Sequence, residues 1–128
     1  METATRPEHL SSDDVCDIAG ITYRQLDYWS RSGLVETIGP ACPGSGGVRR
    51  YLRREVRVVA AIAALRDLGA HGETLRHVAP MLRAMAVDEW AGLWTIPASG
   101  DIEPIYRGAP IDAAYVLDLG RIGLRATV

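Results

Sequence analysis

The sequence predicts an α+β fold, and three local patterns support this prediction. Two short helical patterns are separated by one glycine, Gly20. Two short apolar stretches then flank residues 39–47, which are rich in glycine and proline. Beyond Trp90, short apolar stretches alternate with turn residues. Together these patterns indicate a winged helix-turn-helix with two further helices, followed by a small antiparallel strand-rich tail.

The first helix is predicted over residues 12–19. Residues 11–14 (SSDD) supply the hydroxyl and carboxylate groups that favour a helix N-terminus, and Gly20 is typical of a helix end. Residues 1–10 carry no periodic pattern. We therefore expect a flexible N-terminus over those ten residues.

The second helix is predicted over residues 22–32. Thr22 and Gln25 match the T-x-x-Q capping box, in which each residue satisfies a free backbone N–H of the other. Gly33 marks the end of the helix. Two short helices joined by a tight glycine turn are typical of a helix-turn-helix.

A wing, meaning a hairpin with a long tip, is predicted next. The apolar residues at 34–36 and 48–52 indicate two short strands, and the loop between them contains too much glycine and proline for regular structure. Apolar residues at helical spacing then predict helices over 53–68 and 73–86. These elements together form a predicted winged helix-turn-helix domain, a fold typical of DNA-binding proteins, over residues 11–86.

The C-terminal region, residues 87–128, is predicted to be rich in strands. The segments 93–96 and 102–106 flank a turn and indicate a hairpin. Further strands are predicted at 115–119 and 122–125. This region is a candidate dimerisation or partner-binding element.

Charge is distributed unevenly, although the 128-residue chain has a net charge of only −2. All 14 basic residues are arginine, whose planar guanidinium group suits phosphate and base recognition. Residues 24–57 hold seven arginines and three acidic residues (+4), whereas residues 87–128 hold three arginines and six acidic residues (−3). This distribution predicts a local anion-binding face with a separate acidic appendage.

Several other classes of protein are not supported by the sequence. No apolar run approaches the roughly 20 residues that span a bilayer, and residues 1–12 lack a secretory signal, so a cytoplasmic, nucleoid-associated protein is expected. Cys16 is predicted to be a small core residue and Cys42 to lie in the wing loop. No arrangement typical of a metal site or a catalytic centre is present around His71 and His77. We expect no cofactor, no metal and no enzymatic activity.

The first turn of the second helix carries side chains that suit base recognition. Arg24 can pair with guanine through two hydrogen bonds, and Tyr23 lies beside it. Gln25 can pair with adenine, although its capping role competes with such a contact. Leu26 and Trp29 lie on the opposite face and are predicted to be core residues.

The stretch ITYRQLDYWSRSGLV at residues 21–35 resembles the recognition region of MerR-type transcription regulators. It is most similar to the actinobacterial branch whose second helix reads T-Y-R-Q-L-D-Y-W. The resemblance continues through residues 44–46, residues 49–51 and the helix pair that ends near Arg83, and it covers residues 11–86. It implies that the second helix enters the major groove, that the wing contacts phosphates, and that a dimer binds at promoters.

The predicted DNA contacts combine this resemblance with the chemistry of the side chains. Arg49 and Arg50 are neighbours on a predicted strand and point to opposite faces, so at most one of them contacts DNA directly. Tyr28 and Arg31 are expected to reach phosphates from the outer side of the helix. The full predicted set is Thr22, Tyr23, Arg24, Asp27, Tyr28, Arg31, Arg49, Arg50, Tyr51 and Arg53.

The predicted function is therefore sequence-specific regulation of transcription, with double-stranded DNA as the ligand. A homodimer is expected to form through the tail, with Trp90, Trp94 and Tyr106 pairing across a two-fold axis; packing of the tail on the third and fourth helices is the alternative. RNA polymerase is a further candidate partner. Two other functions stay open: an architectural or excisionase-like DNA-bending protein, and an accessory factor that binds a protein partner.

Overall fold

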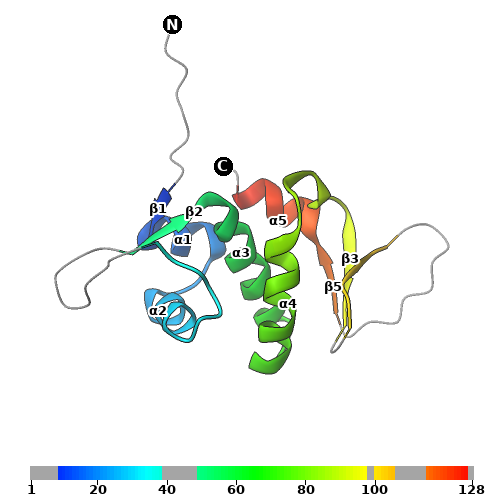
Figure 1. The fold of residues 1–128 in the computed structure, drawn as a ribbon, viewed down its shortest axis with the longest axis horizontal. Coiled ribbons are helices and arrows are strands. Elements are labelled where there is room, and N and C mark those ends of the chain that lie inside the picture. The colour runs from blue at the N-terminus through cyan, green and yellow to red at the C-terminus, as the bar shows by residue number, and fades with distance from the viewer. Residues whose placement is uncertain (1–8, 39–48, 98–99, 106–114, 127–128) are drawn as a thin grey trace, which may run out of the picture.

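The computed structural model describes residues 9–38, 49–97, 100–105 and 115–126. Helices and strands are both present, so the predicted α+β class is confirmed (Figure 1). The elements in chain order are β1 (His9–Ser11), α1 (Ser12–Ala19), α2 (Tyr23–Arg31), β2 (Arg50–Leu52), α3 (Arg53–Asp67), α4 (Gly72–Ala84), a 3-10 turn (Val87–Glu89), β3 (Leu93–Ile96), β4 (Glu103–Pro104), β5 (Tyr115–Asp118) and α5 (Leu119–Ala126).

Local capping determines where the first two helices begin and end, as predicted. The Ser11 hydroxyl accepts a hydrogen bond from the Asp14 N–H at 3.2 Å. Gly20 follows α1 with a φ of 70°, a left-handed conformation that glycine adopts without steric cost. At the start of α2, the Thr22 hydroxyl accepts a hydrogen bond from the Gln25 N–H at 3.1 Å.

Two predictions around β2 are wrong. The N-terminal segment is not flexible up to residue 10, because β1 pairs antiparallel with β2 and aligns Leu10 with Tyr51. Residues 34–36 form no strand. The N–H groups of Leu34 and Val35 both donate to the Trp29 carbonyl, so these apolar residues close the end of α2 and pack into the core. The 39–47 loop lies outside the described residues.

α3 is the central helix of the fold. Nine of its 15 residues are buried, because other elements cover most of its surface. α1, α4 and α5 all pack against it (Figure 1). α4 follows after a short turn and contains Pro80, which the helix tolerates although proline lacks the N–H of a regular turn.

The tail contains a small sheet with strand order β4-β3-β5, in which both pairings are antiparallel. The predicted strand at 122–125 is wrong, because these residues belong to α5. Leu119, Ile122 and Ala126 recur at helical spacing, and the Asp118 carboxylate caps the helix by accepting the Arg121 N–H at 3.0 Å.

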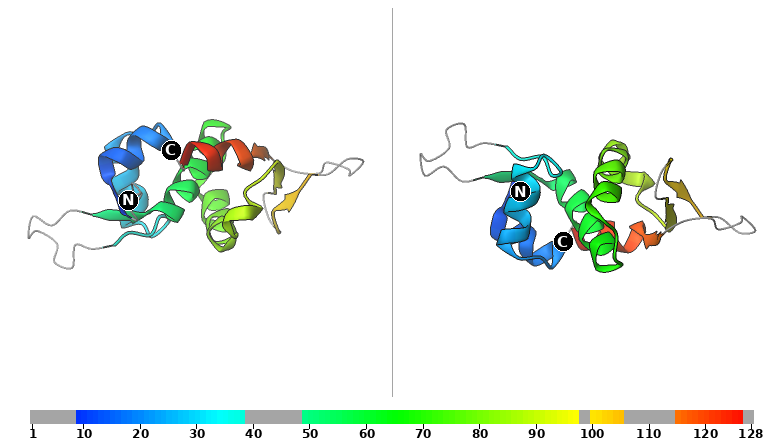
Figure 2. Two further views of the ribbon diagram at one scale, coloured as in Figure 1. Left: turned by 90° about the horizontal axis from the view of Figure 1, so that it is seen from above. Right: turned by 90° about the horizontal axis from the view of Figure 1, so that it is seen from below.

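The tail packs on the rest of the chain through α5. This helix lies against α3 and touches α1, as the perpendicular views also show (Figure 2). Trp90 is only 8% exposed, so the expectation that it pairs with a second copy is wrong. Tyr106 lies outside the described residues. Within the described part of the chain, no helix is long and apolar enough to span a bilayer.

Candidate nucleic-acid interface

α2 has one buried face and one exposed face. Leu26 and Trp29 are buried in the core, as predicted, and the Arg66 guanidinium lies 5.7 Å from the centre of the Trp29 ring. On the other side, Tyr23 and Tyr28 are each 58% exposed, although aromatic side chains are usually buried. The exposed stripe of α2 therefore consists of Tyr23, Arg24, Asp27, Tyr28 and Arg31, with Asp27 less exposed than the others.

The residues of this stripe recur at helical spacing and form an extended surface along one side of α2. Positions 24, 27, 28 and 31 are three or four residues apart and so lie along one side of the helix. Thr22 lies exposed at the N-terminal end of the stripe, where its hydroxyl caps the helix. A helix about 10–12 Å across, with its side chains, fits the major groove of B-DNA.

Asp27 joins two arginines at the edge of this stripe. Its Oδ2 atom accepts a hydrogen bond from Arg31 Nε at 2.9 Å, and its Oδ1 atom accepts one from Arg49, just before β2. The hydrogen bond from Arg49, followed by that from Arg31, lowers the pKa of the Asp27 carboxyl group. The same contact raises the pKa of Arg49. Asp27 therefore carries a negative charge at neutral pH, and both of its oxygens face a cation.

The remaining predicted contact residues lie in β2 and α3. Arg50 is exposed, in contrast to its neighbour Arg49, which pairs with Asp27 within the chain. Tyr51 is fully buried, and its hydroxyl lies 2.9 Å from the Ser30 hydroxyl of α2. It has no surface with which to touch a ligand, so its prediction as a direct contact is wrong. Arg53 begins α3 and is partly exposed.

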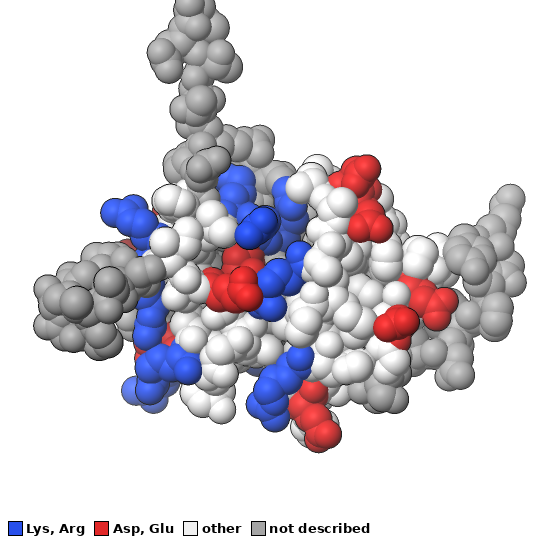
Figure 3. Space-filling view, viewed as in Figure 1, with Lys and Arg blue, Asp and Glu red and all other residues white. Residues whose placement is uncertain are grey.

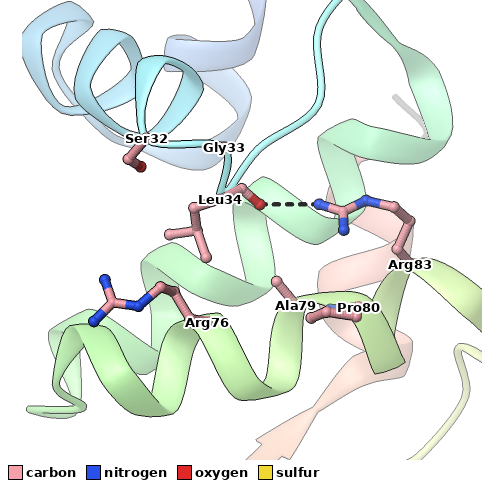
Figure 4. A pocket seen from close by; sticks show the side chains of 7 residues that line it. All are labelled: Ser32, Gly33, Leu34, Arg76, Ala79, Pro80 and Arg83. Carbon is pink, nitrogen blue, oxygen red and sulfur yellow. Dashed lines mark hydrogen bonds between the residues drawn. The ribbon is translucent and has the colours of Figure 1, made fainter.

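A second ion-pair network holds the end of α2, and the sequence analysis missed it. Glu55 is 3% exposed, and its Oε2 atom accepts hydrogen bonds from Arg83 Nη2 at 2.7 Å and from the Glu36 N–H at 3.0 Å. Arg83 also donates to the Leu34 carbonyl at 2.9 Å (Figure 4). This network fixes the chain between α2 and β2 to both α3 and α4. The only sequence signal was an acidic residue followed by an apolar helical run.

A shallow cavity of about 220 Å³ lies beside this network, between the end of α2 and α4 (Figure 4). Leu34 forms its apolar side, and the side chains of Arg76 and Arg83 lie at its two ends. Its remaining lining residues are Ser32, Gly33, Ala79 and Pro80.

Charge is distributed unevenly over the described residues, with arginines concentrated on the helical side and exposed acidic side chains on the tail. In Figure 3 most arginines lie on the side that carries α2 to α4, with some acidic side chains among them, whereas acidic side chains lie over the tail sheet. Asp88, Glu89, Asp101 and Glu103 are all exposed on this tail. A polyanion would therefore meet attraction at α2 and repulsion at the sheet.

The cysteine and histidine residues that the structure describes lie apart from this stripe. Among the described residues, no group of three histidine, cysteine or acidic side chains is placed to hold a metal ion. Cys16 packs partly against the core, and burial raises the pKa of its thiol. His77 bonds the Gly100 carbonyl at 2.7 Å. Cys42 lies outside the described residues.

Comparisons with known proteins agree with this geometry. A family model described as MerR HTH family regulatory protein matches residues 10–82. The chain is 38% identical over 78 residues to an uncharacterized HTH-type transcriptional regulator of Mycobacterium bovis, and equally to two of Mycobacterium tuberculosis. The alignment covers 61% of this chain and 35% of each relative, so the chain spans about a third of the length of the curated relatives it matches. No solved structure matches the chain.

Proposed function

The chain belongs to the MerR HTH family of regulatory proteins, a family of DNA-binding transcription regulators, and from this premise we propose that α2 lies in the major groove and reads the sequence there. The observation that carries this proposal is the two-sided character of α2. Leu26 and Trp29 anchor one face in the core, while Tyr23, Arg24 and Tyr28 stand exposed on the other.

The first turn of α2 supplies the base readout in this proposal. Recognition helices present their N-terminal residues to base edges. Arg24 is exposed there and can pair with guanine N7 and O6 through two hydrogen bonds, a contact worth about 1–3 kcal/mol of discrimination. In this proposal Tyr23 adds apolar contact with a thymine methyl group, and Thr22, exposed at the N-cap of α2, contacts a phosphate.

The flanking arginines supply affinity rather than readout. Arg50 is exposed on β2, where its backbone pairs with Ile38, and it reaches the phosphate backbone from there, with Arg53 close by at the start of α3. Tyr28 and Arg31 contact phosphates along α2. Tyr51 contributes indirectly: it is buried, and the hydrogen bond between its hydroxyl and that of Ser30 holds β2 against the recognition helix.

We further propose that the protein acts in the cytoplasm as a homodimer, with RNA polymerase as a candidate partner. One winged helix-turn-helix buries roughly 600–1,000 Å² on DNA, which gives weak binding, so a second copy is needed for tight binding. The outer face of the tail sheet supports this role, because it exposes Leu93 and Val116. Trp90 takes no part, since it is buried within the chain.

The test is salt-dependent binding of the full chain to fragments of genomic DNA. We expect the wild type to select particular fragments. Arg24→Ala should abolish that preference, whereas Arg50→Ala should weaken binding to all fragments and reduce the salt slope by about one. Equal, weak binding by wild type and both variants would contradict the proposal and favour a protein-binding role for the tail.

A further inference from the structure

We infer that Asp27 increases the DNA selectivity of α2, because it holds Arg31 and Arg49 in place and cancels part of their charge. The inference rests on the proposed function, since it concerns how the recognition helix meets DNA. It assigns Asp27 the role of a positioning residue that contacts no base.

Asp27 occupies an unusual place for an acidic residue. It lies three residues after Arg24 and four before Arg31, in the middle of the exposed stripe of α2. A carboxylate at this place faces the same phosphates that the arginines attract, and like charges repel. An unpaired aspartate would therefore oppose binding to every DNA sequence.

The structure pairs this carboxylate with two cations from different parts of the chain. Arg31 Nε lies 2.9 Å from Oδ2, one helical turn further along α2. Arg49 bonds Oδ1 from the residue before β2, 22 positions away in the sequence. Arg31 is 64% exposed and Arg49 only 26%, so Asp27 pairs with one guanidinium at the surface and one that is already partly packed.

The three side chains together carry a charge of +1, because two arginines and one aspartate are involved. Binding to unrelated DNA depends on the number of positive charges that replace counterions. Binding to a preferred site also depends on where those charges stand, because phosphate contacts set the register of the recognition helix. Asp27 therefore lowers affinity for unrelated DNA while it keeps the arginines in the register that a preferred site requires.

Asp27→Asn tests this inference with a change of charge at nearly constant shape. The probes are a genomic fragment that the wild type prefers and a shuffled duplex of equal length. The variant should bind the shuffled duplex more tightly at 50 mM salt, and its salt slope should be steeper by about one. Between 50 and 200 mM salt it should therefore lose about 3.5-fold more affinity than the wild type does. The ratio of the two affinities should fall several-fold.

Three further variants separate charge from position. Asp27→Asn combined with Arg31→Gln restores the local charge of +1, so the salt slope should return to that of the wild type while the affinity ratio stays low. Arg49→Gln removes the cation of the Asp27–Arg49 pair. It should lower the ratio of the two affinities and make the salt slope shallower by about one. Asp101→Asn, at an exposed position before β4, removes the same charge from the tail and should change neither quantity.

The outcomes distinguish this inference from the proposed function. A wild type without preference for any fragment would contradict the proposed function itself. A selective wild type whose slope and ratio are unchanged in Asp27→Asn would overturn the inference alone. Loss of preferred binding with an unchanged salt slope would overturn it too, because the carboxylate would then be reading a base directly. Should Asp27→Asn lose its helical circular dichroism, Arg49→Gln decides between these outcomes.

Discussion

Removal of the Arg83 guanidinium should destabilise the whole fold. Arg83→Met keeps an unbranched apolar side chain but eliminates the hydrogen bonds to Glu55 at 2.9 and 2.7 Å and the one to the Leu34 carbonyl at 2.9 Å. Glu55 is 3% exposed and would stay buried without its cation. An uncompensated buried charge of this kind costs about 3–5 kcal/mol, a large part of the 5–15 kcal/mol by which domains are stable.

Substitution of the other partner, Glu55, should cost less stability, because the two side chains differ in burial. The Arg83 side chain is 20% exposed and can be hydrated once its partner loses its charge, and in Glu55→Gln the side-chain oxygen still accepts the Glu36 N–H. We expect Glu55→Gln to cost about 1–3 kcal/mol. Asp67→Asn, in the exposed pair with Arg66, is the control and should cost less than about 1 kcal/mol.

Urea unfolding followed by tryptophan fluorescence measures all three variants. The expected order of destabilisation is Arg83→Met, then Glu55→Gln, then Asp67→Asn. A cost below about 1 kcal/mol for Arg83→Met would refute the reasoning, because the pair would then behave like an exposed ion pair. A larger cost for Glu55→Gln than for Arg83→Met would refute the argument from burial.

Three further predictions concern other elements. Thr22→Ala should destabilise the protein by about 1 kcal/mol in urea unfolding, because the Gln25 N–H loses its cap; no change would show that water replaces the hydroxyl. Gly120→Ala should lower the melting temperature although alanine favours helices, because a Cβ atom there would lie 3.0 Å from the Gly92 nitrogen; a higher melting temperature would contradict this. The pKa of Asp27 is lowered in the folded state, so its contribution to stability is present at neutral pH and is lost as the pH falls through that lowered value. Asp27→Asn should therefore lose less stability than the wild type between pH 6 and pH 3, and equal losses in urea unfolding would argue against the pairing.

Elements whose signals are local were predictable from the sequence. Ser11, Gly20 and Thr22 act within a few residues of their own positions, so that α1 begins and ends, and α2 begins, where these residues predict. The inner face of α2 was also predictable, because the spacing of Leu26 and Trp29 fits one side of a helix.

Elements that depend on distant contacts were not predictable. Leu34 and Val35 have the apolar character of a strand, but the Trp29 carbonyl captures their N–H groups at the end of α2. α5 contains glycines that are rare inside helices, and its formation depends on packing against α3.

In the candidate site too, contacts between residues close in the sequence were predictable and contacts between distant residues were not. The Asp27–Arg31 pair is four residues apart and could be predicted from helix geometry, whereas Arg49 reaches Asp27 only through the fold. The burial of Tyr51 likewise follows from the pairing of β2 with β1, which no local pattern indicated.

Methylation interference on a fragment that the wild type selects is the most direct test of α2 as the recognition helix. Guanine N7 lies in the major groove and adenine N3 in the minor groove, so the two methylated positions report on different grooves. We predict that methylation of a guanine N7 in each half-site of the dimer blocks binding, and that Arg24→Ala removes this sensitivity. Interference confined to adenine N3 would contradict placement of α2 in the major groove.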